Sequence, residues 1–172
     1  MQVAFLRAIN VSTRRVSMDR LRGAFEGLGF EDVATFIASG NVLFRAAGAA
    51  AALEAKIEPA LAAALGFEVP SFVRRPAEVE RIVARQPFDA ADADLVHVGF
   101  LKKAASASVR AALEAAGNDT DEVTARGKEI YWLARGGMGR ARISGAALEK
   151  IAGGPTTLRS LKMLRRLHEK LT

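Results

Sequence analysis

Hydrophobic and polar positions in the first 75 residues change period several times, and each change marks an element. Met18, Leu21, Phe25 and Leu28 are spaced as one face of a helix, and Ser17 stands before them as an N-cap. The other segments have the alternation of strands or the four-residue spacing of a second helix. The predicted elements are a strand over 2–8, a helix over 18–28, a hairpin over 33–38 and 42–45, a helix over 49–65 and a strand over 68–74.

The same order of elements begins again after a connecting helix over 76–85 and a loop. The predicted elements are a strand over 95–101, a helix over 104–116, a hairpin over 122–125 and 129–134, and a helix over 144–151. The last strand of this half is expected to be missing or reduced to a few residues near Thr156–Leu158, and a helix around Arg159–Leu171 ends the chain.

Each half therefore follows the βαββαβ order that is typical of ferredoxin-like folds. The expected fold class is α+β, with two ferredoxin-like subdomains, the second irregular, and an added C-terminal helix. The expected boundaries are 1–75 for the first subdomain, 76–94 for the connecting helix and loop, and 95–172 for the second subdomain. The internal repeat is one of element order and not of residues.

The composition bears on the cellular location of the protein and shows where along the chain its basic residues lie. The chain has 172 residues and no cysteine, which excludes disulfides and thiolate metal sites and favours a cytoplasmic location. Neither a secretion signal nor a membrane span is evident in the sequence. The net charge of +6 is concentrated in residues 135–172, which carry 9 basic and 2 acidic residues. Any anionic partner is therefore expected to bind towards the C-terminus.

Several short stretches in a fixed order resemble a known bacterial family, the domain of unknown function 1697 (DUF1697). They are Leu6–Val11, Ser39–Val42, Phe67–Pro70, Ala125–Tyr131 and Gly139–Arg140. The resemblance implies two ferredoxin-like subdomains and implies no activity. The chain departs from the family pattern at residues 12–15, where glycines and a lysine are usual, and at 158–163, where only Arg159 is kept from the usual run.

The predicted topology brings one group of polar residues together in the first half. The third strand of a split βαβ unit lies beside the first and runs antiparallel to it, so Arg7 and Asn10 should lie near Ser39, Gly40 and Asn41. The first helix begins close by, and its N-terminus favours an anion. The alternative is that both asparagines satisfy backbone groups in turns.

The repeat predicts an equivalent corner in the second half with basic side chains in place of amides. Lys102 and Lys103 follow the first strand there, and Arg126 and Lys128 flank the hairpin turn. A phosphate-like group would suit this corner. Solvated side chains in exposed turns would give the same sequence pattern.

A third candidate is the glycine-rich link over 136–142, in which Arg140 follows three glycines. Such a link can present backbone N–H groups to a phosphate. It matches neither the dinucleotide fingerprint nor the P-loop, and a plain connector is the alternative.

The C-terminal helix offers a fourth candidate, a basic stripe opposite a leucine face. Arg159, Lys162, Arg166 and Lys170 follow one another at spacings of three or four residues. Such a stripe can follow a nucleic-acid backbone, and a solvated charged face is the alternative.

Catalytic and RNA-binding signatures are largely absent from the sequence. The two histidines, His97 and His168, lie in no metal or nucleophile motif, and no cofactor or metal is expected. Asp121 and its acidic neighbours are best explained as solvated loop residues. The stacking platform of RNA-binding ferredoxin-like sheets is not evident, because Tyr131 and Trp132 should point to opposite faces of their strand.

These observations favour a cytoplasmic binding or regulatory protein for a small anionic ligand or a nucleic-acid backbone. Two alternatives stay open. One is an enzyme acting on a phosphorylated or carboxylated metabolite, with Arg7, Asn10 and Asn41 as binding groups. The other is a homo-oligomeric scaffold.

Overall fold

A computed structural model describes residues 1–10, 15–37 and 40–172 of the chain. The chain divides into two compact units, Met1–Glu78 and Val79–Thr172. Each unit is described below by itself. Among the described residues, no helix combines the length and the apolar character needed to cross a membrane.

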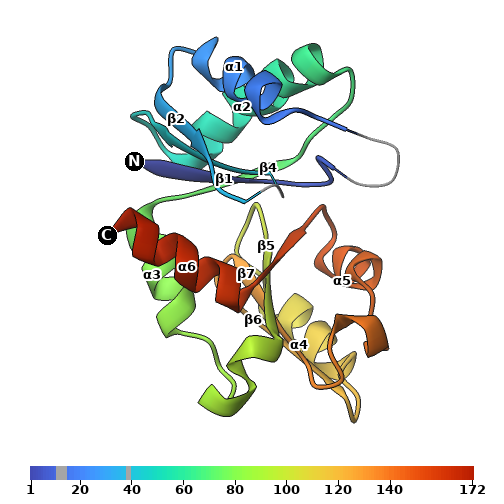
Figure 1. Cartoon of the computed structure of the whole chain (residues 1–172). Helices are drawn as coiled ribbons and strands as arrows, with labels where there is room; N and C mark the ends of the chain where they lie inside the picture. The colour runs from blue at the N-terminus through green and yellow to red at the C-terminus, as the bar shows by residue number, and fades with distance from the viewer. Residues whose placement is uncertain (11–14, 38–39) are drawn as a thin grey trace. The chain divides into compact units, whose positions relative to one another are not determined.

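The first unit contains one four-stranded antiparallel sheet with the strand order β2-β3-β1-β4. Helices α1 and α2 both lie on one side of this sheet (Figure 1). This arrangement confirms the ferredoxin-like fold expected for the first half. The elements are β1 (Gln2–Leu6), α1 (Met18–Glu26), β2 (Glu31–Thr35), β3 (Asn41–Arg45), α2 (Ala50–Leu65) and β4 (Ser71–Arg74), after which α3 (Pro76–Ala84) begins.

Local signals in the sequence account for the helix ends of this unit. The Ser17 hydroxyl accepts a hydrogen bond from the Arg20 backbone N–H at 3.2 Å, as an N-cap does. Helix α2 ends at Gly66, which adopts the left-handed conformation with φ 81°. The core between the sheet and the two helices includes Phe25 packed edge-on against Phe44, with ring centroids 5.3 Å apart.

The second unit has a sheet with the equivalent order, β6-β7-β5-β8, also antiparallel throughout. Residues of α4 and α5 form a core cluster with one face of this sheet, and α6 contacts β5 and η1. The two sheets therefore have the same relative strand order, as two ferredoxin-like subdomains require. The elements are η1 (Ala90–Leu95), β5 (Val96–Phe100), α4 (Ala107–Ala115), β6 (Asp121–Arg126), β7 (Glu129–Ala134), η2 (Met138–Arg140), α5 (Gly145–Ala152), β8 (Thr157–Ser160) and α6 (Leu161–Leu171).

The end of the second unit contains the short last strand expected near Thr156–Leu158 and then the C-terminal helix, with a different boundary between them. Strand β8 is present, and it places Arg159 directly opposite Val98 of β5. The prediction that the last helix begins around Arg159 is wrong, because α6 begins at Leu161. Its start is set by Ser160, whose hydroxyl accepts from the Met163 backbone N–H at 3.2 Å.

A buried carboxylate holds several segments of the second unit together. Asp121 is 0% exposed, so its interpretation as a solvated loop residue is wrong. One of its oxygens accepts from the Trp132 indole N–H at 3.0 Å, and the other accepts from the Arg142 backbone N–H at 2.8 Å. Burial raises the pKa of this carboxyl, but the hydrogen bonds from Trp132 and Arg142, with those from Asn118 and Thr120, outweigh burial and lower the pKa overall.

Candidate functional site

The first predicted corner forms as the topology requires. The Leu6 backbone N–H donates to the Gly40 carbonyl at 2.9 Å, so the end of β1 meets the turn that precedes β3. Gly40 has φ +78°, and a Cβ there would lie 3.0 Å from the Ile9 side chain. Only glycine satisfies both conditions. Ser39, the remaining predicted residue of this turn, lies outside the described residues.

The amide side chains of this corner bond to backbone groups. The Asn10 carbonyl oxygen accepts from the Val16 backbone N–H at 2.8 Å. Asn41 is 0% exposed, and its amide donates to the Phe36 carbonyl at 2.9 Å. These bonds agree with the alternative in which both asparagines stabilise turns. Arg7 is half-buried, and a ligand-binding role for it stays a prediction.

The second corner repeats the main-chain geometry of the first. The Leu101 backbone N–H donates to the Lys128 carbonyl at 2.8 Å, which corresponds to the bond between Leu6 and Gly40. A second bond of 2.8 Å joins the Ala105 N–H to the Gly127 carbonyl. The β6–β7 hairpin turn therefore fixes the segment that leaves β5 and leads to α4.

A cavity of about 400 Å³ lies beside this segment. We call it the Lys102–Lys103 pocket. It is bounded by the loop after β5, the first turn of α4 and the loop that connects α5 to β8. Its lining residues are Leu101, Lys102, Lys103, Ala104, Ala105, Ser106, Val109, Ala152, Gly153, Gly154 and Pro155. Its volume falls within the range of small-molecule sites.

The electrostatics of the Lys102–Lys103 pocket favour an anion on the α4 side. Ser106 is the N-cap of α4, and its hydroxyl accepts from the Val109 N–H at 3.2 Å. The first backbone N–H groups after a cap have no intrahelical acceptor, and the helix dipole is positive at this end. Lys102 is half-buried and Lys103 exposed at the same wall. Two cationic side chains and a helix N-terminus therefore meet there.

The other wall of the pocket has the opposite polarity. Helix α5 ends at Gly153, which is left-handed with φ 75° and donates its N–H to the Glu149 carbonyl at 2.9 Å. The last carbonyl groups of a helix lack intrahelical donors, so this wall offers acceptors. The pocket thus combines a positive wall for an anionic group with a wall that suits hydroxyl or amino groups.

Three other basic residues that were predicted to bind a ligand, two from this corner and one from the glycine-rich link, do not line the pocket. Arg126 is exposed and donates through Nη1 to the Arg85 carbonyl at 2.8 Å. Lys128 is exposed and lies in the hairpin turn. Arg140 is exposed in η2, in the glycine-rich link. Ligand-binding roles for these three residues stay predictions.

Arg159 does not belong to the predicted exposed stripe on the last helix. It lies on β8 and is only 8% exposed. Its Nη1 donates to the Thr157 hydroxyl and to the Leu158 carbonyl, both at 2.8 Å. Burial lowers the pKa of this guanidinium to about 10, so it is still protonated at neutral pH. The stripe on α6 is reduced to Lys162, Arg166 and Lys170, all of which are exposed.

Two parts of the Lys102–Lys103 pocket were missed from the sequence. The helix predicted over 104–116 includes Ser106, although a serine before Ala107 is a recognisable N-cap signal. In the sequence, Gly153, Gly154 and Pro155 indicate only a break between helices. No local signal shows that this break returns to the end of β5.

Metal and base-stacking chemistry find no support in the described part of the chain. Within residues 1–10, 15–37 and 40–172, no group of three or more His, Cys, Asp or Glu side chains is placed to hold a metal ion. Tyr131 and Trp132 are each 1% exposed, so neither offers a surface for stacking. Burial lowers the pKa of the His97 imidazole, which favours its neutral form.

Comparison with known proteins identifies the fold and a family. A family model described as "Protein of unknown function (DUF1697)" matches residues 1–131. The solved structure titled "The structure of conserved bacterial protein SP0830 from Streptococcus pneumoniae" is similar, with a TM-score of 0.71 and 22% sequence identity over 99% of this chain and 97% of that chain. No curated protein matches the sequence.

Proposed function

Because the chain belongs to the DUF1697 family, whose function is not established, we propose a function from its own side chains: it binds a small phosphate-bearing or similar anionic ligand in the Lys102–Lys103 pocket. The observation that carries the proposal is the meeting of Lys102, Lys103 and the capped N-terminus of α4 at one wall of a cavity. A cytoplasmic location also stays a prediction.

The rigid backbone of the site supports ligand binding, as opposed to a corner whose lysines are merely solvated. Backbone bonds from Leu101 and Ala105 to the β6–β7 turn hold the lysine-bearing segment in place before any ligand arrives. Preorganised groups lose less entropy when a ligand binds. The charges and backbone groups of the two walls can hold a ligand without any catalytic step. Binding is therefore the function that these residues support directly.

Replacing both pocket lysines with alanine tests the proposal. Titration of the full chain with inorganic pyrophosphate should shift the backbone amide NMR signals of residues 101–109 and 152–155 in a saturable manner. The Lys102→Ala/Lys103→Ala variant should bind about tenfold more weakly, because hydrogen bonds to charged groups contribute about 1.5 kcal/mol or more.

The matched control removes the same charge elsewhere in the same unit. Lys162→Ala/Lys170→Ala changes two exposed lysines on α6 and should leave pyrophosphate affinity unchanged. Equal weakening in the two variants, or signal shifts spread over the whole basic surface, would show non-specific charge attraction and contradict the proposal.

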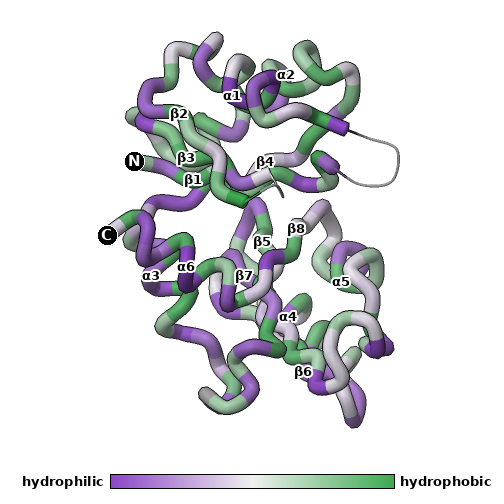
Figure 2. The backbone as a smooth tube through the Cα atoms, viewed as in Figure 1, coloured by the Kyte–Doolittle hydropathy of each residue, from purple (hydrophilic) through white to green (hydrophobic). Residues whose placement is uncertain are grey.

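The exposed basic face of α6 supports a second candidate, binding of a nucleic-acid backbone. Leu161, Leu164 and Leu167 are buried, so the exposed Lys162, Arg166 and Lys170 share the opposite side of the helix. Polar and apolar residues along α6 can be followed in Figure 2. Glu169 is also exposed there, which weakens the field of the stripe.

Salt-dependent DNA binding distinguishes this second candidate. If the stripe contacts phosphates, Lys162→Ala/Arg166→Ala/Lys170→Ala should reduce the slope of log K against log salt by about 0.9 per lost contact with duplex DNA. Fluorescence anisotropy with a labelled duplex measures the slope. The control Arg110→Ala/Arg142→Ala/Lys150→Ala removes three exposed charges from other segments. Equal slopes in the two triple variants would exclude a specific role for α6.

A further inference from the structure

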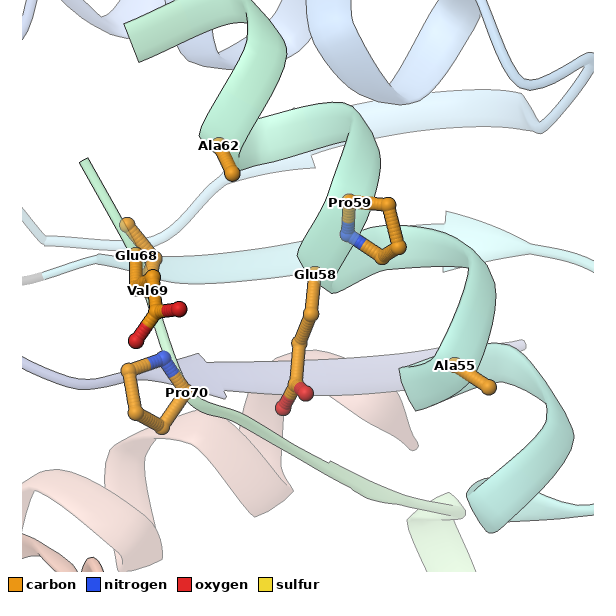
Figure 3. A pocket seen from close by; sticks show the side chains of 7 residues that line it. All are labelled: Ala55, Glu58, Pro59, Ala62, Glu68, Val69 and Pro70. Atoms are coloured by element: carbon orange, nitrogen blue, oxygen red, sulfur yellow. The ribbon is translucent and has the colours of Figure 1, made fainter. Parts of the chain in front are cut away.

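The first unit contains a cavity of its own. It has a volume of about 340 Å³ and lies between α2 and the segment that leads into β4 (Figure 3). We call it the Glu58–Glu68 cavity. Its lining residues are Ala55, Glu58, Pro59, Ala62, Glu68, Val69 and Pro70. It belongs entirely to Met1–Glu78 and is independent of the Lys102–Lys103 pocket.

Two carboxylates from different elements meet at this cavity. Glu58 on α2 is half-buried, and one of its oxygens accepts from the Ser71 backbone N–H at 2.8 Å and from the Ser71 hydroxyl at 3.3 Å. These bonds fix the orientation of the Glu58 side chain. Glu68 is exposed in the segment before β4. Figure 3 shows both carboxylates directed to the space beside Pro70.

A proline inside α2 adds a third acceptor. Pro59 lies in the interior of the helix and has no backbone N–H, so the carbonyl of Ala55 lacks the donor that residue i+4 normally provides. Helix carbonyls point along the axis towards the C-terminus, and both Ala55 and Pro59 line the cavity. The helix interior therefore presents a main-chain acceptor on the same side as Glu58.

The remaining walls are apolar and suit a hydrocarbon chain. Pro59, Pro70 and Ala62 contribute only carbon atoms through their side chains. The wall at Pro70 is held in place, because its carbonyl accepts from the Arg7 backbone N–H at 2.9 Å. A compact metal ion would not use these walls, whereas an alkyl chain with a charged end would bury its methylene groups there.

We propose that the Glu58–Glu68 cavity binds a small primary amine, with the ammonium group between the carboxylates and the Ala55 carbonyl and the alkyl chain against the prolines. An ammonium group has three donors, and the cavity offers acceptors from two segments, α2 with Glu58 and Ala55 and the segment before β4 with Glu68. The volume of the cavity is in the range of small-ligand sites, so a small free amine fits it better than an amine carried by a large molecule.

The test is a titration of the full chain with 1,5-diaminopentane, followed by amide NMR signals. Signals of residues 55–70 should shift in a saturable manner. The neutral alcohol 1-pentanol, which has the same chain length and no charge, should produce no saturable shift. Glu68→Gln should weaken diamine binding about fivefold, as expected for loss of a partly solvated charge pair.

A matched variant separates a local effect from one of overall charge. Glu26→Gln removes an exposed carboxylate on α1, outside the cavity, and should leave diamine affinity unchanged. The proposal is overturned if pentanol binds as well as the diamine, if residues 55–70 do not respond, or if both glutamine variants weaken binding equally. None of these outcomes bears on the Lys102–Lys103 pocket.

Discussion

Replacing Asp121 with asparagine is expected to lower the free energy of unfolding by about 3 kcal/mol, because charge-assisted hydrogen bonds would be lost in a buried place. The carboxylate accepts from the Trp132 indole, the Arg142 backbone N–H, and the side chains of Asn118 and Thr120. An asparagine would turn its own NH₂ group either towards the Trp132 indole or towards the three donors that bond to Oδ2. At least one buried donor would then have no acceptor.

The pH dependence of this loss has a defined sign. The folded-state pKa of Asp121 is lowered, because the four hydrogen bonds outweigh the opposing effect of burial. Such a group stabilises the folded state above its unfolded pKa, and this contribution disappears as the pH falls through the folded pKa. The difference between wild type and Asp121→Asn should therefore be constant near neutral pH. It should shrink only below the ordinary value of 3.8.

Urea denaturation followed by tryptophan fluorescence measures this effect directly. Trp132 is the sole tryptophan of the chain, and it donates to Asp121, so its emission reports the same site. The control Asp119→Asn changes an exposed carboxylate two residues away and should shift stability by less than about 0.5 kcal/mol. Similar losses in the two variants, or a difference that grows in acid, would refute the role assigned to Asp121.

Element order could be predicted from the sequence because each half is locally consistent. The face formed by Met18, Leu21 and Phe25, with Ser17 before it, specifies α1 without tertiary information. In a split βαβ unit the third strand lies beside the first and runs antiparallel to it, which predicts that the end of β1 lies next to Gly40. The hydrogen bond from the Leu6 N–H to the Gly40 carbonyl confirms this prediction. Local patterns and one topological rule are enough for the fold.

Burial in short segments could not be predicted in the same way. Residues 158–163 carry leucines at helical spacing, so Arg159 fitted an exposed stripe. Pairing of β8 with β5 decides its place, and that pairing joins segments about 60 residues apart in the chain. The burial of Asp121 could not be predicted for the same reason. Its acidic neighbours in the sequence indicate a solvated loop, whereas its buried donor, the Trp132 indole, comes from the neighbouring strand.

In the candidate sites, too, some features follow from local sequence and others depend on tertiary contacts. Lys102 and Lys103 were predicted together from the repeat, but the pocket also needs the loop that follows α5, whose return to β5 is a tertiary property. The Glu58–Glu68 cavity did have a signal in the sequence. Pro59 stands inside a segment predicted as one long helix, and a proline there leaves a carbonyl of the preceding turn without its helical donor.

Gly99→Ala is expected to destabilise the protein by about 2 kcal/mol, although replacing glycine with alanine in a strand usually stabilises it. A Cβ at this position of β5 would lie 3.0 Å from the Thr156 hydroxyl oxygen, 3.3 Å from Leu158 and 3.4 Å from Ile130. All three atoms belong to side chains, from β7, from β8 and from the residue before β8, and they leave the added methyl group little room. Thermal or urea unfolding measures the loss.

A second substitution should reverse most of this loss. The Thr156 hydroxyl oxygen is buried and has no hydrogen-bond partner among the described residues, so its removal costs no hydrogen bond. Thr156→Ala in the Gly99→Ala background should recover more than 1 kcal/mol, roughly the coupling expected for residues in direct contact. The control Gly139→Ala adds a Cβ with no atom within 4 Å and should be nearly neutral. Strictly additive effects of Gly99→Ala and Thr156→Ala would mean that Thr156 does not lie over β5.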